Sequence, residues 1–260
     1  MEADDLVALG RPPRKRKVPS VRKPRRQSER REDAMAQILD AAEKVFAQQG
    51  RNGVTLRAVA KEAAVDPALV HYYFEDIDGV FHAVFQRKSM VINALRNEAM
   101  DHYLAEHGDN PTIEGVFDVF LRPVFQAIAE NPKYWANYAA IVSYTVSLRR
   151  DYTSSSRFGG RELMRETFDV AVHRFIDMLK RLAPEAPPEE IYWFYHHVAG
   201  SFAVALAQTG RIDSLSGGLC KSSDMMAVLD SMVRVFSAGF EAVKARAGEA
   251  RRPRPRRRSG

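Results

Sequence analysis

The chain has 260 residues, of which 45% are hydrophobic, and a formal net charge of +6 at pH 7. This length allows one large or two small domains, and the apolar runs are too short for a membrane span. The single cysteine, Cys220, excludes an intrachain disulfide, and no Cys/His spacing predicts structural zinc. The charged N-terminus lacks the apolar core of a signal peptide. We therefore expect a cytoplasmic protein without a metal, another cofactor or a membrane partner.

The positive charge is concentrated near the two ends of the chain. Residues 11–31 carry eleven Lys and Arg against one acid, and residues 251–258 carry six Arg and no acid. Neither end shows apolar periodicity. Residues 1–30 are therefore predicted to be a disordered basic arm, and residues 249–260 a disordered basic tail.

Residues 55–74 predict two short helices joined by a tight turn. Thr55 can cap the first helix and Asp66 the second, with Pro67 at the first helical position. Ala64–Val65 form the turn. The first helix has an apolar stripe with the spacing i, i+3, i+4 and i+7, which consists of Leu56, Val59, Ala60 and Ala63.

The second of these helices has an unusual surface. Val70 and Phe74 are predicted to face inward. The residues left outside are Pro67, Ala68, Leu69, His71, Tyr72 and Tyr73. Leu and two Tyr make a poor solvent face, but they suit a helix that enters a DNA groove.

A helix is also predicted before this pair. Its apolar stripe is Ile38, Leu39, Ala42, Val45 and Phe46, and it ends near Gly50, Asn52 and Gly53. In order, IleLeuAspAlaAlaGluLysValPheAlaGlnGlnGly, ValThrLeuArgAlaValAla and ValHisTyrTyrPhe resemble the DNA-binding domain of the TetR family of bacterial transcriptional regulators. The resemblance runs from about Arg31 to Phe85. The competing interpretation is a helical hairpin inside an ordinary all-α protein, but several spaced motifs agree in order and distance.

The resemblance and the residue chemistry together nominate the DNA contacts. Arg57 is the best base reader, because a guanidinium can bond bidentately to guanine O6 and N7; alternatively, it pairs with Glu62. Ala68 and Leu69 can contact thymine methyls, while hydroxyl groups suit phosphates or sugars. The predicted DNA-binding set is Thr55, Arg57, Pro67, Ala68, Leu69, His71, Tyr72 and Tyr73.

Three positions depart from the family pattern. His71 stands where Tyr is usual, Ala64 replaces a common turn Gly, and Ile77 replaces a Lys that typically binds phosphate. Residues 32–78 also carry only four Lys and Arg against nine acids. We expect the arm of residues 1–30 to compensate by following phosphates or entering a minor groove. Otherwise it is only a solvated tail.

The remaining sequence predicts six longer helices, at about 79–105, 112–130, 133–150, 161–183, 188–209 and 223–247. No segment alternates convincingly with period two. We expect an all-α fold of about nine helices in two units. Residues 31–77 form a three-helix helix-turn-helix DNA-binding domain, and residues 78–248 a six-helix effector-binding and dimerisation domain.

The last two predicted helices suggest a dimer interface. Apolar residues recur in the 223–247 helix at spacings typical of a helix-packing seam, and the 188–209 helix is apolar nearly all round. The family resemblance implies a four-helix dimer bundle, while the alternative is an intrachain core. The predicted interface residues are Tyr195, Phe202, Leu229, Met232, Phe236 and Phe240.

Large aromatic residues could line an effector pocket with a few polar groups, or pack in the core. The candidate ligand-binding residues are Phe120, Tyr134, Trp135, Tyr138, Tyr144, Phe175, Trp193 and His196. Residues 182–220 loosely resemble a TetR subgroup that includes fatty-acid-responsive regulators, which implies a hydrophobic or acyl effector. The arginines that could pair with an effector carboxylate are Arg122, Arg149, Arg150, Arg165 and Arg174.

The function expected from these features is a homodimeric, ligand-responsive repressor that releases its double-stranded DNA operator when a small effector binds. The alternatives are a regulator without an effector, or an activator. An enzyme is disfavoured because the chain has no H-E-x-x-H spacing, phosphate-cradling Gly loop or Ser nucleophile elbow.

Overall fold

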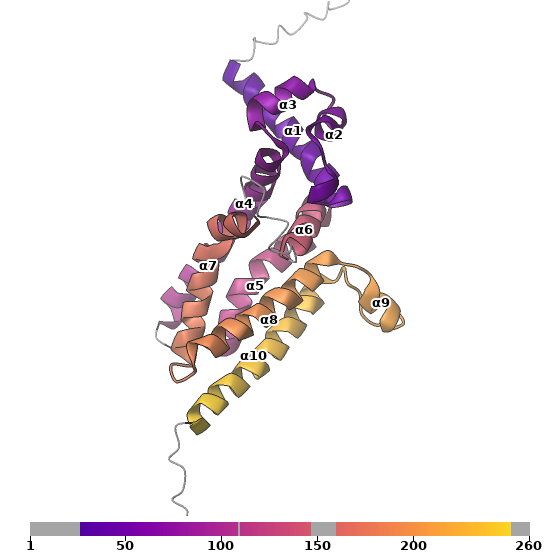
Figure 1. Ribbon diagram of the computed structural model, residues 1–260. Helices are drawn as coiled ribbons and strands as arrows, with labels where there is room; N and C mark the ends of the chain where they lie inside the picture. Colours follow the sequence, from indigo (N-terminus) through magenta and orange to yellow (C-terminus); the bar gives the residue numbers. More distant parts are fainter. Residues whose placement is uncertain (1–26, 109, 147–159, 251–260) are drawn as a thin grey trace, which may run out of the picture.

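The computed structural model describes residues 27–108, 110–146 and 160–250. These residues form helices and no strand, which confirms the all-α prediction (Figure 1). The helices are α1 (Gln27–Gln49), the 3-10 turn η1 (Arg51–Gly53), α2 (Leu56–Glu62), α3 (Pro67–Phe74), α4 (Ile77–His107), α5 (Ile113–Glu130), α6 (Pro132–Val146), α7 (Gly160–Leu182), α8 (Pro188–Ala207), α9 (Arg211–Leu215) and α10 (Met225–Ala250).

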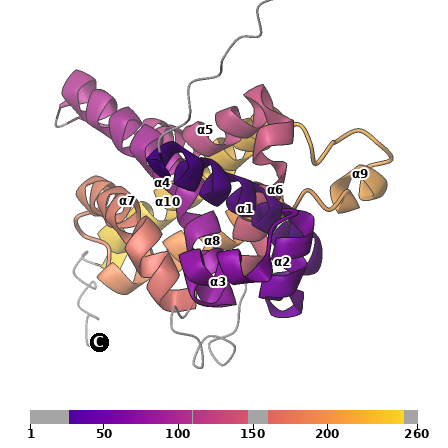
Figure 2. The same ribbon diagram turned by 90° about the horizontal axis from the view of Figure 1, so that it is seen from above.

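Helices α1, α2 and α3 form a unit at one end, and α4 runs from it along the larger helical domain (Figures 1 and 2). One continuous set of buried apolar residues extends from Ile38 in α1 to Phe240 in α10. α1 also packs directly against α4 and α6. The two units are therefore joined by side-chain packing as well as by the chain.

Most predicted helices are found with small shifts at their ends. α1 begins at Gln27, inside the segment predicted as the disordered arm. Residues 1–26, the tail after residue 250 and the end of the predicted 133–150 helix lie outside the described residues. The sequence pattern missed α9, which lies between the helices predicted at 188–209 and 223–247. Within the described ranges no helix is long and apolar enough to cross a membrane.

Gly79 fixes where α4 begins relative to α3. Its main-chain nitrogen donates a hydrogen bond to Asp76 Oδ1 at 2.7 Å, which caps α4. A Cβ atom at Gly79 would collide with the main-chain oxygen of Phe74, the last residue of α3. A larger residue would therefore push α3 and α4 apart.

The turn between α2 and α3 contains a strained alanine. Ala64 has φ of 52°, in the left-handed region that disfavours residues with a Cβ. The turn is held by Val65 N, which donates to Ala60 O at 3.0 Å, and by Gln37 Nε2 of α1, which donates to Ala63 O at 2.7 Å. Packing imposes the conformation despite the alanine.

Ala64→Gly should therefore stabilise the protein. Relief of the left-handed strain exceeds the entropy that glycine adds to the unfolded chain, so we expect the free energy of unfolding to rise by about 0.5–1 kcal/mol. Ala36→Gly, at an exposed site inside α1, is the matched control and should lose about 1 kcal/mol. Chemical denaturation measures both. A loss of stability in Ala64→Gly would contradict the strain assignment.

Candidate functional site

The predicted caps of the two short helices are confirmed. Thr55 Oγ1 accepts a hydrogen bond from Ala58 N at 3.2 Å. Asp66 Oδ1 accepts one from Ala68 N at 2.7 Å, and Pro67 occupies the first turn of α3. These local bonds satisfy main-chain donors that would otherwise be unpaired at each helix start.

α3 presents the surface that the sequence predicts. Val70 is 0% exposed and Phe74 is 9% exposed, which confirms that they face inward. Tyr72 is 76% exposed, and its ring meets that of Tyr73 edge-on at 5.3 Å. Tyr73 is half-buried and lies 5.8 Å below the Arg31 guanidinium of α1. The other predicted contact residues of α3 comprise exposed Pro67, Ala68 and His71 and half-buried Leu69.

Arg57 is exposed near the start of α2. Its alternative partner, Glu62, is instead bound by Lys44 of α1. Among the described residues no acid forms an ion pair with Arg57, so its guanidinium can reach outward. This arrangement fits the predicted base reader.

Intrachain ion pairs further reduce the free positive charge of this unit. Of the four Lys and Arg in residues 32–78, Lys44 binds Glu62 and Arg51 binds Asp78. Only Arg57 and Lys61 remain without an acidic partner among the described residues. The unit alone can therefore displace few counterions from DNA.

Arg57→Ala should weaken binding to the cognate operator by about 1–3 kcal/mol and relax preference at one base pair per half-site. Lys61→Ala is the matched control, because the loss of a cation that contacts only phosphate weakens all sequences alike. Fluorescence titrations against selected and scrambled duplexes distinguish the two. Equal losses on both duplexes for Arg57→Ala would rule out base reading.

A buried ionic cluster joins the DNA-facing unit to the larger domain. Glu43 of α1, only 4% exposed, accepts hydrogen bonds from Lys88 Nζ at 2.6 Å and Arg87 Nη2 at 2.8 Å. Lys88 also donates to the main-chain oxygen of Tyr134 in α6. Arg87 binds the exposed Asp40 of α1 at 2.7 Å. We call Glu43, Arg87 and Lys88 the Glu43 clamp.

Removal of the Glu43 charge should leave Lys88 buried without an anion. We expect Glu43→Gln to lower the free energy of unfolding by about 3–5 kcal/mol. Asp40→Asn is the control: its side chain is 73% exposed, so its loss should cost at most about 1 kcal/mol. The double variant Glu43→Gln/Lys88→Met should recover most of the stability. Thermal or urea unfolding measures these free energies. Equal losses of stability in Glu43→Gln and Asp40→Asn would contradict the role assigned to the clamp.

A second cluster lies inside the larger domain, around Arg96 of α4. Arg96 is 4% exposed, and its Nε donates to the main-chain oxygen of Phe120 at 3.0 Å. Its guanidinium lies 4.6 Å from the ring centre of Phe120 and 5.4 Å from that of Phe202. In the described part of the chain no carboxylate pairs with it. Burial lowers the pKa of Arg96, although an arginine stays charged in proteins.

Two tyrosines approach this guanidinium. Tyr138 of α6 and Tyr195 of α8 both contribute to its electrostatic environment. Burial raises the pKa of Tyr138 to about 12 and also raises that of Tyr195. Both are therefore neutral hydroxyls at physiological pH and do not neutralise Arg96. Ser89 Oγ donates to Tyr138 OH at 3.2 Å.

The predicted ligand residues divide into separate groups. Phe120 and Phe175 stack at 4.1 Å beside Arg96, and Tyr138 faces the same cluster. Trp135 lies 5.5 Å from Tyr138, and exposed Tyr134 lies beside Trp135. Tyr144 is half-buried, and its hydroxyl has no hydrogen-bond partner within the described part of the chain.

Trp193 and His196 lie apart from the other predicted ligand residues. Trp193 is 64% exposed and His196 is exposed beside it on the outer face of α8. Because α8 is apolar nearly all round, its sequence pattern does not say which side faces the core.

Sequence reasoning also missed Arg96. Of the five arginines proposed as carboxylate partners, Arg122 is bound by Asp118 and Arg174 by Asp101. Arg165 is exposed, and residues 149–150 lie outside the described ranges. The spacing of Ser89, Ile92, Arg96, Met100 and Tyr103, which are all buried, is the pattern that places Arg96 inside.

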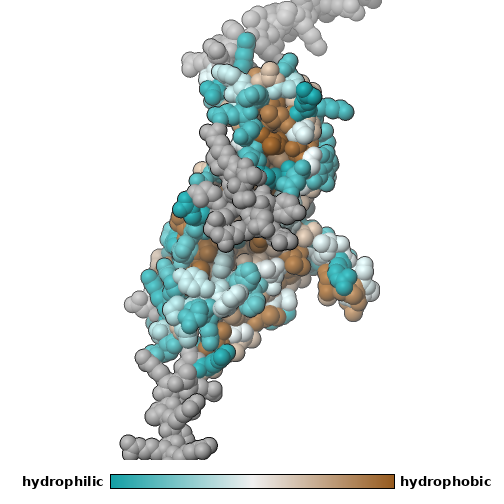
Figure 3. Space-filling model, viewed as in Figure 1, coloured by the Kyte–Doolittle hydropathy of each residue, from teal (hydrophilic) through white to brown (hydrophobic). Residues whose placement is uncertain are grey.

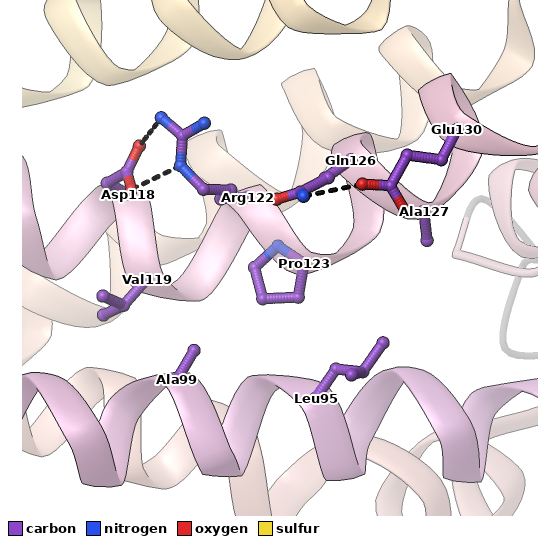
Figure 4. Close-up of a pocket in the computed structure, with 9 residues that line it drawn as sticks. All are labelled: Leu95, Ala99, Asp118, Val119, Arg122, Pro123, Gln126, Ala127 and Glu130. Carbon is purple, nitrogen blue, oxygen red and sulfur yellow. Dashed lines mark hydrogen bonds and ion pairs between the residues drawn. The ribbon is translucent and has the colours of Figure 1, made fainter.

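A groove between α4 and α5 is less suited to a small-molecule ligand than the cluster around Arg96 (Figure 4). It has a volume of about 280 Å³, and Val119, Pro123 and Ala127 of α5 line it opposite Leu95 and Ala99 of α4. At its rim Arg122 is held by both oxygens of Asp118, at 2.6 and 2.7 Å, and Gln126 by Glu130. Its cation is already neutralised, and its volume falls below the ~300 Å³ typical of small-molecule sites.

The six residues predicted at the dimer interface pack within their own subunit. Leu229 and Phe240 are 0% exposed and Met232 is 8% exposed, because α10 lies along α5. The Phe236 ring stacks 6.3 Å from that of Phe117 in α5. Tyr195 and Phe202 face Arg96. Leu229, Met232 and Phe240 therefore belong to the intrachain core, since helix periodicity indicates a partner helix but not the chain that supplies it.

The fold and the exposed α3 surface define a helix-turn-helix DNA-binding protein with a larger helical domain after the DNA-facing unit. Residues 38–84 match the model of bacterial regulatory proteins of the tetR family, and residues 118–239 match that of the tetracyclin repressor-like C-terminal domain. The chain belongs to the TetR family of bacterial transcriptional regulators. Members of this family are non-enzymatic DNA-binding proteins.

Individual similar proteins agree with this assignment. The chain is 26% identical over 88 residues to IcaR of Staphylococcus epidermidis, a negative transcriptional regulator of the biofilm operon icaADBC. That match covers 34% of this chain and 44% of the relative's length.

Solved structures show the same fold. A TetR-like regulator from Rhodococcus sp. RHA1 has a TM-score of 0.54 at 17% identity, with coverage of 84% of this chain and 100% of that one. The hemolysin II transcriptional regulator HlyIIR has a TM-score of 0.51 at 20% identity, with coverage of 77% and 97%.

Proposed function

We propose that the protein is a homodimeric repressor that releases its operator when it binds an amphipathic carboxylate, such as a fatty acid. In this proposal α3 of each subunit enters a major groove, and the two half-sites lie about one helical turn apart. Repression is supported by the similarity to IcaR, which is described as a negative regulator. The observation that carries the effector class is the buried, unneutralised Arg96.

A buried cation without an anion is costly, and proteins normally pair such charges. Arg96 donates a main-chain hydrogen bond and has two aromatic neighbours, but no carboxylate pairs with it among the described residues. A bound carboxylate would supply the missing negative charge through charge-assisted hydrogen bonds. Tyr138 could donate a further hydrogen bond, because it is neutral.

The surroundings of Arg96 favour an effector with an apolar chain. Phe120, Phe175 and Phe202 place ring faces or edges around the guanidinium. An acyl chain could pack on these rings while its carboxylate faces Arg96. A small inorganic anion would use only the charge and none of this apolar surface.

The same cluster lies next to the Glu43 clamp. Ser89, which bonds Tyr138, follows Lys88 directly in α4. An effector that displaces Tyr138 would therefore disturb α4 and α6 where Lys88 joins them to α1. The shift in operator affinity equals the difference in effector affinity between the two arrangements.

Arg96→Met separates this function from a purely structural role. Dodecanoate should release the wild-type protein from its operator, and methyl dodecanoate should act at least about tenfold more weakly, a difference of ~1.4 kcal/mol. Arg96→Met should abolish this discrimination, and its stability should stay equal or rise by about 1–4 kcal/mol, because an apolar side chain replaces a buried charge. Fluorescence anisotropy of labelled operator and thermal unfolding provide the two measurements.

Arg122→Met is the control, since that guanidinium is half-exposed and held by Asp118. It should retain the preference for the carboxylate. A large loss of stability in Arg96→Met would assign Arg96 a structural role. Equal release of the operator by dodecanoate and by its methyl ester would exclude a carboxylate effector. A fall in transcription of the target genes on deletion of the regulator gene would indicate an activator.

A further inference from the structure

Two buried oxygen atoms between α4 and α7 lack hydrogen-bond partners. Figure 3 shows many hydrophilic side chains, in teal, on the surface of the larger domain, where water can bond to them. Asn93 Oδ1 and Thr167 Oγ1 are instead buried, and neither has a partner among the described residues. A buried polar atom without a partner costs free energy, so it marks a place where a bound molecule can supply the missing bond.

The Asn93 side chain joins the two helices through its amide nitrogen. Nδ2 donates a hydrogen bond to the main-chain oxygen of Thr167. This bond fixes the orientation of the amide, because Oδ1 can only accept and could not bond to another acceptor. Asn93 Oδ1 therefore needs a donor that the described part of the chain does not supply.

The hydroxyl group of Thr167 belongs to the same contact. Its Oγ1 has no partner in the described ranges, so it does not bond to Asn93 Oδ1 either. Asn97, about one turn further along α4, shows the paired alternative, because its Oδ1 accepts a hydrogen bond from Arg174 Nη1 of α7 at 2.8 Å. The contact between α4 and α7 thus contains one satisfied asparagine oxygen and one that is open.

The two open oxygens adjoin the cluster around Arg96. Asn93 precedes Arg96 by three residues in α4, a spacing that puts both side chains on one helix face with Cβ atoms roughly 5–6 Å apart. Ser89, one turn before Asn93, is buried and bonds to a tyrosine of the same cluster. Across the contact, Thr167 lies about two turns before Phe175 of α7, whose ring also belongs to the cluster.

The group that completes this arrangement is a hydroxyl. A hydroxyl donates one hydrogen bond, which Asn93 Oδ1 can accept, and it can accept one from Thr167 Oγ1. An N–H group could donate to Asn93 but could not accept from Thr167. A carboxylate cannot pair with Asn93 Oδ1, because both are acceptors. The ligand therefore needs a hydroxyl in addition to its carboxylate.

We propose that the effector is a hydroxylated acyl carboxylate with its hydroxyl on the third carbon. The carboxylate faces Arg96, the hydroxyl bridges Asn93 Oδ1 and Thr167 Oγ1, and the acyl chain packs on the aromatic rings. Three helical residues advance ~4.5 Å along α4, which the bonds between a carboxylate oxygen and a hydroxyl on the third carbon can span. The assignment rests on the proposed function, because Arg96 must hold the carboxylate.

Three acids of equal chain length test the hydroxyl on the wild-type protein. We expect 3-hydroxydodecanoate to release labelled operator at a concentration at least about tenfold below that of dodecanoate or 12-hydroxydodecanoate. Fluorescence anisotropy measures release, and the rise in unfolding temperature with each acid measures binding without DNA. The two enantiomers of 3-hydroxydodecanoate should differ, because the bridging oxygens come from two fixed helices. Equal action of the enantiomers would overturn the bridge.

Two substitutions test the residues of the bridge. Thr167→Val removes the hydroxyl with little change of shape, and Asn93→Leu removes the amide. Each should reduce the preference for 3-hydroxydodecanoate over dodecanoate to about threefold or less. Ser237→Ala is the matched control, because it removes another buried hydroxyl without a partner in the described ranges, on α10, and it should retain the preference. An equal loss of preference in Ser237→Ala would contradict the bridge.

The outcomes separate this inference from the proposed function. If dodecanoate and 3-hydroxydodecanoate release the operator equally while methyl dodecanoate remains weaker, Arg96 binds a carboxylate but the hydroxyl bridge is wrong. If neither acid releases the operator or raises the unfolding temperature, the carboxylate effector is refuted, and the bridge with it.

Discussion

The Glu43 carboxylate is the contact on which the relation between the two domains depends. It is buried between α1, which belongs to the DNA-facing unit, and two consecutive cations of α4, and Lys88 extends the link to α6. A buried charge tolerates few arrangements, because displacement leaves it both unpaired and out of water. The clamp therefore holds the DNA-facing unit, and α3 with it, in one orientation more firmly than apolar packing alone would. Apolar packing alone allows neighbouring helices to slide. Gly79 acts at the other end of the same connection by allowing α4 to start directly beneath α3.

This rigidity is what would let an interior ligand affect DNA binding. Arg96 lies two turns along α4 from Lys88, and Ser89 and Tyr138 occupy the interval between them. The two clusters differ in a decisive respect: Lys88 has its anion within the chain, whereas Arg96 has none among the described residues. A ligand whose anion pairs with Arg96 would change the interactions of α4. The same helix carries Arg87 and Lys88 of the Glu43 clamp. The adjacency makes such coupling physically accessible, and a measured difference in operator affinity is what would establish it.

A structural feature of this protein can be predicted from the sequence when the interactions that determine it lie close together along the chain. The helix-turn-helix could be predicted because Thr55, Asp66 and Pro67 act within one turn of their own helices. The packing partner of Leu229 and Phe240 could not be predicted, because their spacing requires a partner helix without saying that α5 of the same subunit supplies it. The exposure of Trp193 could not be predicted for a related reason, since α8 has no polar face to set its orientation. Arg96 was missed because charged residues usually lie on the surface. Its register on α4 nevertheless places it among buried residues.

The features that cost this protein stability or affinity lie where function is proposed. Ala64 is held in a left-handed conformation in the turn that presents α3, and Arg96 is a cation without a counter-ion among the described residues. Local rules are expected to fail at working sites, where an external partner completes the arrangement.

The acidic DNA-facing unit follows the same logic. With half of its few cations bound in ion pairs, it has little general attraction for phosphate, so binding must draw on specific contacts at α2 and α3 or on basic segments elsewhere in the chain. Such a division favours discrimination between sequences, because non-specific affinity and base reading are then supplied by different parts of the protein.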